Sequence, residues 1–240
     1  MNRRLTPFLV AIAIVLAANF EASAQKSSSP RVRETDALMR VLDEAINIKD
    51  LKDGASIASL EEWAQARGKE LPIFIDMKAF QDEGSQAVFK GEIPPPKLLG
   101  LPRRMRVGDL LQVMVAQFEE ESTLLVRKGR VEITTKKAAS RENLLKQTFV
   151  ASFDLQPLEL VLEDLADISG VTVIVDGRAK DKIRTSVTAR FRNDVPLRDA
   201  LRMLTESAEL KLVILPGGLF VTTPAHAEVL ERNGTAQPAQ

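Results

Sequence analysis

The stretch LEEWAQARGKELPIFIDMKAF, residues 60–80, has a second version in LEDLADISGVTVIVDGRAK, residues 162–180. Each version contains an amphipathic helical pattern that closes at a glycine, and then a β-branched run that ends at an aspartate. Repetition of this kind marks duplicated structural units. The sequence therefore predicts two similar modules, with Gly68 and Asp76 in the first corresponding to Gly170 and Asp176 in the second.

Further matches extend the repeat downstream. MRVGDLLQVM (105–114) corresponds to VPLRDALRML (195–204), and GRVEITT corresponds to GLFVTT. The spacing of apolar residues predicts strand, helix, strand, strand, helix and a terminal hairpin in each copy, with the helices packed on small sheets. The predicted fold class is α+β, with two tandem βαββαββ modules.

The N-terminus has the pattern of a secretory signal peptide. Arg3 and Arg4 precede an apolar core, and Ala22-Ser23-Ala24 supplies a small-x-small cleavage site. We therefore expect cleavage after Ala24 and an exported protein of the periplasm or cell envelope, with an uncleaved membrane anchor as the alternative. The predicted organisation is a signal peptide (1–24), a disordered linker (25–34), the first module (35–137), a second linker (138–147), the second module (148–228) and a disordered tail (229–240).

The composition excludes several kinds of site. The 33 basic and 33 acidic residues balance, so no net charge attracts the whole chain to nucleic acid or anionic lipid. The absence of cysteine rules out disulfides and thiolate metal sites. The only histidine, His226, lies beyond the last predicted strand, and no nucleophile motif or glycine-rich phosphate loop accompanies it. We predict no catalytic residue, no cofactor and no metal.

Matching apolar positions carry a resemblance to a known family. In the second copy they are Pro157-Leu158, Leu162, Gly170-Val171, Val173, Asp176, Val187, Val195-Pro196-Leu197 and Ala200-Leu201, and in the first they are Leu60, Gly68, Asp76, Leu111 and 130–135. On these residues, 149–223 resembles the short N-terminal (STN) module shared by secretins and TonB-dependent receptors. Residues 41–135 resemble a diverged version, and the pair is similar to exported tandem-repeat proteins of planctomycete type.

The resemblance implies an interaction module of the cell envelope. In secretins such modules pack side by side into rings, and in receptors they relay a signal to a regulatory partner. No outer-membrane barrel or channel domain follows the modules in this sequence, which favours a free-standing adaptor over a ring or a relay.

Several recurring or unusual side chains have structural explanations. Asp76 and Asp176 occupy the same point of each copy, and we expect each carboxylate to cap the following turn rather than to bind a ligand. Trp63 is expected in the core, because it aligns with Leu165.

Two surfaces are candidates for binding. The first is a basic stretch, Arg178, Lys180, Lys182, Arg184, Arg190 and Arg192, of which we single out Arg184, Arg190 and Arg192. These charges either keep an edge strand soluble or dock an acidic protein or an anionic glycan. Nucleic acid is excluded as a partner, because few aromatic residues accompany the charges and the expected compartment is wrong.

The second candidate is the loop GEIPPPKLLGLPRRMRV. The first copy is longer than the second at this point, and triple proline favours an extended segment. Long loops of small domains often carry binding, although two leucines here could instead cover the sheet. The candidate residues are Pro94, Pro95, Pro96, Leu98, Leu99, Arg103 and Arg104.

These features predict a non-enzymatic exported adaptor that binds another envelope protein or its own copies. The alternative is a binder of cell-envelope polysaccharide. The chain has no tyrosine and one tryptophan, so such binding would be ionic rather than by stacking on sugars.

Overall fold

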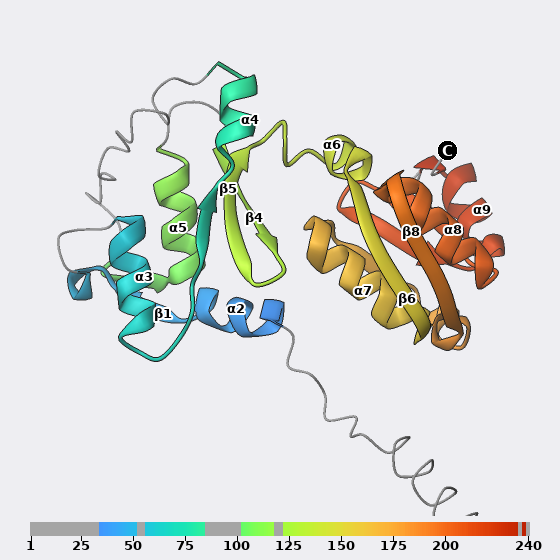
Figure 1. Cartoon of the computed structure of the whole chain (residues 1–240), viewed down its shortest axis with the longest axis horizontal. Coiled ribbons are helices and arrows are strands. Elements are labelled where there is room, and N and C mark those ends of the chain that lie inside the picture. Colours follow the sequence, from blue (N-terminus) through green and yellow to red (C-terminus); the bar gives the residue numbers. More distant parts are fainter. Residues whose placement is uncertain (1–33, 52–55, 85–101, 118–121, 235–236, 239–240) are drawn as a thin grey trace, which may run out of the picture. The chain divides into compact units, whose positions relative to one another are not determined.

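A computed structural model describes residues 34–51, 56–84, 102–117, 122–234 and 237–238. The predicted signal peptide and most of the linker after it lie outside the described residues, as do the predicted binding residues Pro94, Pro95, Pro96, Leu98 and Leu99. The described residues form helices and small sheets, which confirms the α+β class (Figure 1).

The first region, residues 34–135, alternates short strands with helices. The elements in chain order are α2 (Glu34–Leu42), β1 (Ala45–Asn47), the 3-10 helix η1 (Ile48–Asp50), α3 (Ile57–Gln65), β2 (Ile73–Ile75), α4 (Met77–Asp82), β3 (Arg104–Arg106), α5 (Val107–Val115), β4 (Ser122–Arg127) and β5 (Arg130–Thr135).

The second region, residues 148–232, follows the helix α6 (Arg141–Lys146). Its first and third strands are much longer than those of the first region. The elements are β6 (Thr148–Pro157), α7 (Leu158–Ser169), β7 (Val173–Val175), the 3-10 helices η3 (Gly177–Ala179) and η4 (Lys182–Arg184), β8 (Ser186–Pro196), α8 (Leu197–Ser207), β9 (Lys211–Leu215), β10 (Gly218–Thr222) and α9 (Pro224–Arg232), after which β11 (Gln237–Pro238) joins the sheet.

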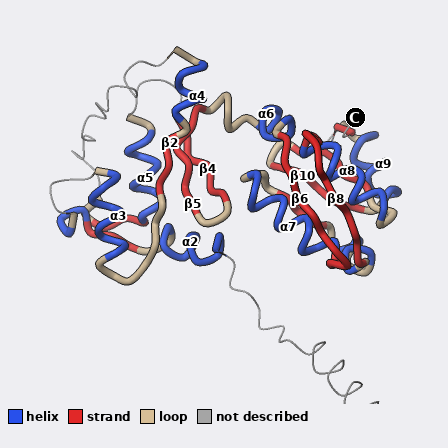
Figure 2. Tube along the Cα trace, in the orientation of Figure 1, coloured by secondary structure: helices blue, strands red, loops and turns tan. Residues whose placement is uncertain are grey.

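Each region builds one antiparallel pair and one larger sheet (Figure 2). In the first region β1 pairs with β3, and the sheet order is β2-β5-β4; in the second β6 pairs with β8, and the order is β7-β10-β9-β11. The short strand is parallel to its neighbour in both sheets, with Phe74 opposite Glu132 and Ile174 opposite Phe220. The two sheets therefore share the same strand order and register apart from β11.

The helices place their apolar stripes against these sheets. Leu60 of α3 and Leu111 of α5 are fully buried with Val131 of β5 in the first core. The second core gathers Leu162 of α7 and Leu201 of α8 in the same way. Trp63 is buried, as predicted.

Some local features were not predicted. The helix α3 begins with a capping box between Ser56 and Ser59, whose hydroxyls accept from each other's backbone N–H at 3.1 and 2.9 Å. The expected linker contains α6. The expected disordered tail holds the last turns of α9, which starts at Pro224 and buries Ala227, and the strand β11. Only one of the nine residues of α9, Ala227, is buried, so its sequence has little of the apolar periodicity by which a helix is predicted.

Candidate functional site

The recurring aspartates lie at the start of a turn in both regions, which confirms the predicted capping role. Asp76 Oδ1 accepts from the backbone N–H of Ala79 at 3.1 Å, and Asp176 Oδ1 accepts from that of Arg178 at 3.0 Å. The second oxygen of each carboxylate accepts from a threonine hydroxyl on the neighbouring strand, Thr134 at 3.1 Å and Thr222 at 2.6 Å. Sequence reasoning missed this tie, although the threonines of GRVEITT and GLFVTT were its visible signal.

Asp176 is a buried, charged carboxylate. Burial alone raises its pKa, but hydrogen bonds from the Thr222 hydroxyl, from the Arg178 backbone and from the Arg178 guanidinium together lower that pKa to about 2. His226 Nε2 lies 3.9 Å from Asp176 Oδ2, a proximity that no pattern in the sequence predicted. The buried Thr222 hydroxyl donates to the aspartate and not to His226, so this cluster fixes a turn rather than activating a nucleophile.

The strands β6 and β8 form a two-stranded ribbon with one face in the core. Phe149 and Phe153 on β6 meet Phe191 on β8, with ring centroids 5.4 and 6.5 Å apart. Because side chains alternate along a strand, Val150 and Ser152 on β6 and Arg190 and Arg192 on β8 point to the opposite, solvent-facing side. We call that side the outer ribbon face.

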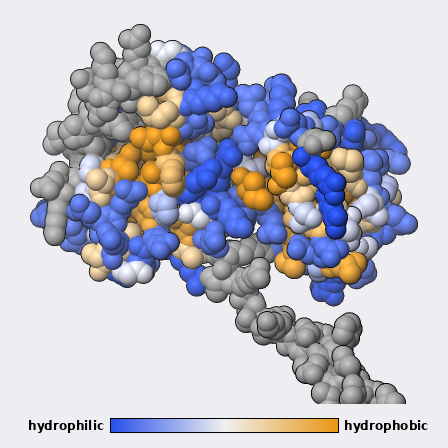
Figure 3. Space-filling view, in the orientation of Figure 1, coloured by the Kyte–Doolittle hydropathy of each residue, from blue (hydrophilic) through white to orange (hydrophobic). Residues whose placement is uncertain are grey.

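The outer ribbon face carries Arg190 and Arg192. Both side chains are exposed, and Arg190 stands opposite Ser152. Within the described residues neither arginine has an ion pair, and the nearby exposed Asp154 and Asp194 have none either. In the view of Figure 3, hydrophilic side chains lie over β8 with small apolar patches beside them.

The β6–β8 pairing has two irregularities, the first with its extra residues on β8 and the second with its extra residue on β6, and a large exposed apolar side chain of β6 lies at each. The pairing with β8 shifts between Phe149 and Ala151 and again between Phe153 and Gln156. Val150 at the first shift is 76% exposed, and Leu155 at the second is 73% exposed. Leu155 also has a φ of 48°, a left-handed conformation that is costly for a residue other than glycine. Its backbone N–H donates to Thr188 Oγ1 at 3.1 Å, which holds the bulge against β8.

The rest of the predicted basic stretch does not form one patch. Arg184 is exposed at the end of η4, next to the start of β8. Arg178 binds Asp176 at 3.1 Å, and Lys182 binds Glu209 at 2.6 Å. Lys180 is exposed after η3 and has no ion pair within the described residues, so the unneutralised charge of this stretch extends from Lys180 through Arg184 to β8.

Arg103 and Arg104 belong to the first region. Both are exposed, and Arg104 begins β3 opposite Asn47. The backbone carbonyl of Arg103 accepts from the N–H of Ile48 at 3.1 Å, so the pair is anchored to the β1 side of the region. The proline and leucine part of the predicted loop lies outside the described residues.

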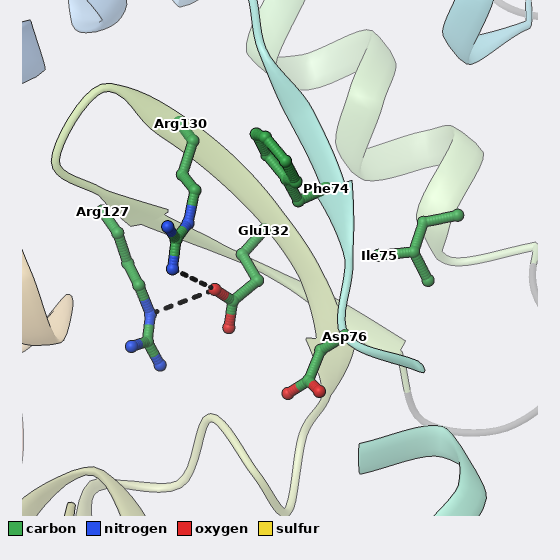
Figure 4. Close-up of a pocket in the computed structure, with 6 residues that line it drawn as sticks. All are labelled: Phe74, Ile75, Asp76, Arg127, Arg130 and Glu132. Carbon is green, nitrogen blue, oxygen red and sulfur yellow. Dashed lines mark hydrogen bonds and ion pairs between the residues drawn. The ribbon is translucent and has the colours of Figure 1, made fainter. Parts of the chain in front are cut away.

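A second candidate surface is a shallow hollow of about 380 Å³ on the sheet β2-β5-β4 (Figure 4). Arg127 Nε and Arg130 Nη2 both bind Glu132 Oε2, at 3.4 and 3.3 Å. The Arg130 guanidinium also lies 5.7 Å from the ring of Phe74, which is 55% exposed. Because these arginines already share a carboxylate, the hollow offers less free positive charge than the outer ribbon face.

Comparisons with known proteins found no match, whether to models of protein families, to curated proteins or to solved structures. In the part of the chain that the structure describes, no three acidic or histidine side chains are grouped closely enough to hold a metal ion. None of the helices formed by those residues has the length and apolar character needed to span a membrane.

Proposed function

We propose that this chain is an exported, non-enzymatic adaptor of the cell envelope, composed of two βαββαββ modules of the STN type. The shared strand order of the two sheets and the repeated aspartate–threonine tie support the duplication. The small-x-small site at residues 22–24 supports export.

The observation that carries the interaction role is the outer ribbon face. Two exposed arginines, which have no ion pair within the described residues, lie beside two of the most exposed apolar side chains, Val150 and Leu155, and the exposed Asp154 and Asp194 are on the same ribbon. Isolated exposed apolar residues are common on soluble proteins. The combination of apolar side chains with unneutralised arginines is instead typical of protein-binding surfaces, in which arginine is enriched.

Crosslinking in envelope extract of the source organism tests this proposal. The chain, tagged at its C-terminus, should crosslink to a discrete protein, and Arg190→Glu with Arg192→Glu should weaken that crosslink. Arg40→Glu with Lys49→Glu is the matched control, because it makes the same charge change on exposed basic residues of the first region that belong to neither candidate surface. Equal crosslinking by both double variants would contradict the role of the ribbon.

The same variants separate the adaptor from a polysaccharide binder. Ionic binding of an anionic glycan should fall steeply at moderate salt, because exposed charges are screened over about 8 Å at physiological ionic strength. Retention of the chain on envelope polysaccharide, lost with salt and lost in the ribbon variant, together with no crosslinked protein, would replace the adaptor by the glycan binder.

A further inference from the structure

The hollow on the sheet β2-β5-β4, which we call the sheet hollow, lies on the side of the sheet that faces away from the core. Val131 and Ile133 of β5 are buried in the cores of the first region, so Glu132 between them points to the opposite side. Phe74 of β2 stands opposite Glu132 in the register and points the same way (Figure 4). Paired strands hold such side chains in fixed relative positions, as a binding site requires.

Phe74 supplies the sheet hollow with a flat apolar wall. Its side chain is 55% exposed, and among the described residues no other phenylalanine or tryptophan ring is exposed. The guanidinium of Arg130 lies 5.7 Å from the ring. An exposed aromatic ring beside a charged group is the usual form of a surface that holds a partly apolar, partly polar ligand.

The polar wall of the sheet hollow has hydrogen-bonding groups without partners. The Arg127 side chain is only 15% exposed, and its Nε is buried with no hydrogen bond, since the ion pair with Glu132 at 3.4 Å is not one. Both arginines of the hollow bind Glu132 Oε2, so Oε1 has no partner among the described residues. Nearly all buried polar groups in folded proteins are hydrogen-bonded. The exception here indicates that a bound molecule completes the donors and acceptors of this wall.

The charges that line the sheet hollow cancel. Arg127 and Arg130 bring two positive charges, and Glu132 and Asp76 bring two negative ones. An anion would meet two carboxylates there and a cation two guanidinium groups, so the lining favours an uncharged ligand that both donates and accepts hydrogen bonds. A sugar ring has these properties, with hydroxyls around its rim and an apolar C–H face. The volume of about 380 Å³ is at the lower end of small-molecule sites, about 300–1,000 Å³.

We propose that the sheet hollow binds one neutral sugar unit of a polysaccharide, with the apolar face of the sugar on Phe74 and its hydroxyls on Arg127 and Glu132. This site goes beyond the proposed adaptor function and does not rest on it. It also differs from the ionic glycan binding considered for the outer ribbon face, both in its place on the molecule and in the charge of its ligand.

The second sheet provides an internal control. Ile174 and Phe220 stand at the positions of Phe74 and Glu132, and His226 of α9 contacts Phe220 with ring centroids 6.4 Å apart. The carboxylate of the sheet hollow is therefore replaced by an apolar ring in the second copy. Ile174 is 46% exposed, so its truncation matches that of Phe74 in position and in loss of apolar surface.

Amide NMR of the full chain, as purified from an expressing cell, tests the site with two neutral oligosaccharides, chitotetraose and maltotetraose. At least one of them should shift the amide signals of β2 and β5 with a dissociation constant of about 0.1–5 mM, as expected for a shallow site. The signals of β7 and β10 should not move. Because the ligand is uncharged, the dissociation constant should change less than about twofold between about 50 and 500 mM salt.

Substitutions separate the roles of the two walls. Phe74→Ala should weaken sugar binding at least about tenfold, and Phe74→Leu should weaken it too, because it keeps apolar bulk without a flat ring. Arg130→Ala should also weaken binding, since the charge balance of the hollow is lost. Ile174→Ala should bind sugar like the unmodified chain, as should Arg190→Glu with Arg192→Glu. Thermal unfolding of each variant verifies that it is folded.

Three results would each overturn the sugar site. The first is the absence of shifts in β2 and β5 with either oligosaccharide at about 10 mM. The second is tighter, salt-sensitive binding of the anionic tetragalacturonate at the same strands. The third is a Phe74→Ala chain that binds no sugar less well but loses the crosslink to an envelope protein, which would assign the hollow to that protein. The adaptor proposal is judged separately, by the crosslinks of the ribbon variants.

Discussion

The two ribbons of this molecule have the same place in the chain but differ in length and in the pairing of their arginines. The β1–β3 ribbon is three residues long, and its Arg106 is neutralised by Asp109 at 2.9 Å and by Asp43 at 3.6 Å, whereas its exposed Arg104 has no ion pair within the described residues. The β6–β8 ribbon is about three times longer, and its outer arginines have no ion pair within the described residues. The repeated topology needs only the short version. We infer that the additional length and charge of the second ribbon serve binding.

The larger sheets differ in a similar way. The positions of Phe74 and Glu132 in the first region correspond by register to Ile174 and Phe220 in the second. His226 of α9 contacts Phe220, with ring centroids 6.4 Å apart, whereas Glu132 binds two arginines. The same sheet position is therefore apolar where a terminal helix follows and charged where none does.

Deleting an equivalent core leucine from each region tests the duplication with the largest expected effect. Leu60 and Leu162 are both fully buried at matching points of the repeat. Leu60→Ala and Leu162→Ala should each lower the free energy of unfolding by about 2–5 kcal/mol, because each leaves a cavity. Urea unfolding measures both losses. A loss below about 1 kcal/mol in either variant would show that the two positions are not equivalent.

The aspartate–threonine ties should differ in strength. Thr222→Val removes a 2.6 Å bond to a buried carboxylate and should cost about 1–3 kcal/mol, whereas Thr134→Val removes a 3.1 Å bond to Asp76 and should cost less. Thr222→Val should also raise the pKa of Asp176, since that hydroxyl stabilises its charged form. Urea unfolding and carboxyl NMR titration check the two statements. A larger cost for Thr134→Val would reverse the proposed order of the two ties.

The sequence predicted the elements that depend on repeated apolar spacing. The helices α3, α5, α7 and α8 and the terminal hairpins follow stripes that burial requires, and the two aspartates were correctly expected to cap turns. The threonine ties were missed because they join residues 58 and 46 positions apart, a distance over which local patterns carry no information.

The candidate site was predicted only in part. Alternation in β8 was sufficient to place Arg190 and Arg192 on the polar face. The exposure of Leu155 could not be predicted, because regular alternation from Phe149 through Phe153 would turn it inward. Only the bulge, which is set by pairing with β8, turns it outward.

Acidification should weaken the second region through Asp176. Its pKa is about 2 in the folded chain and 3.8 for an unperturbed aspartate, so the unfolded state takes up a proton first as the pH falls. The stabilisation is complete above about pH 4 and is lost towards pH 2, with a loss of about 1 kcal/mol at pH 3. The difference in pH dependence between the unmodified chain and Asp176→Asn isolates this contribution from the other carboxylates. Identical curves would show that Asp176 titrates normally.

The smallest expected change in stability belongs to Leu155→Gly, which alters a bulge of the β6–β8 ribbon. Leu155→Gly removes the conformational strain of a left-handed residue, which is about 1–2 kcal/mol for a residue other than glycine. The glycine also gives the unfolded chain more conformational entropy, which lowers the free energy of unfolding by about 0.5–1 kcal/mol. The side chain is mostly exposed, so little burial is lost, and the net change should be a stabilisation of about 0.5–1 kcal/mol in urea unfolding. The same variant should crosslink more weakly to its partner in envelope extract, because it removes one apolar side chain of the ribbon.

Glu209→Gly is the control, because Glu209 is the other non-glycine residue with positive φ (54°) among the described residues, and it should leave crosslinking unchanged. A Leu155→Gly chain that gains stability and crosslinks normally would make the bulge a structural irregularity of the long ribbon and not part of its binding face.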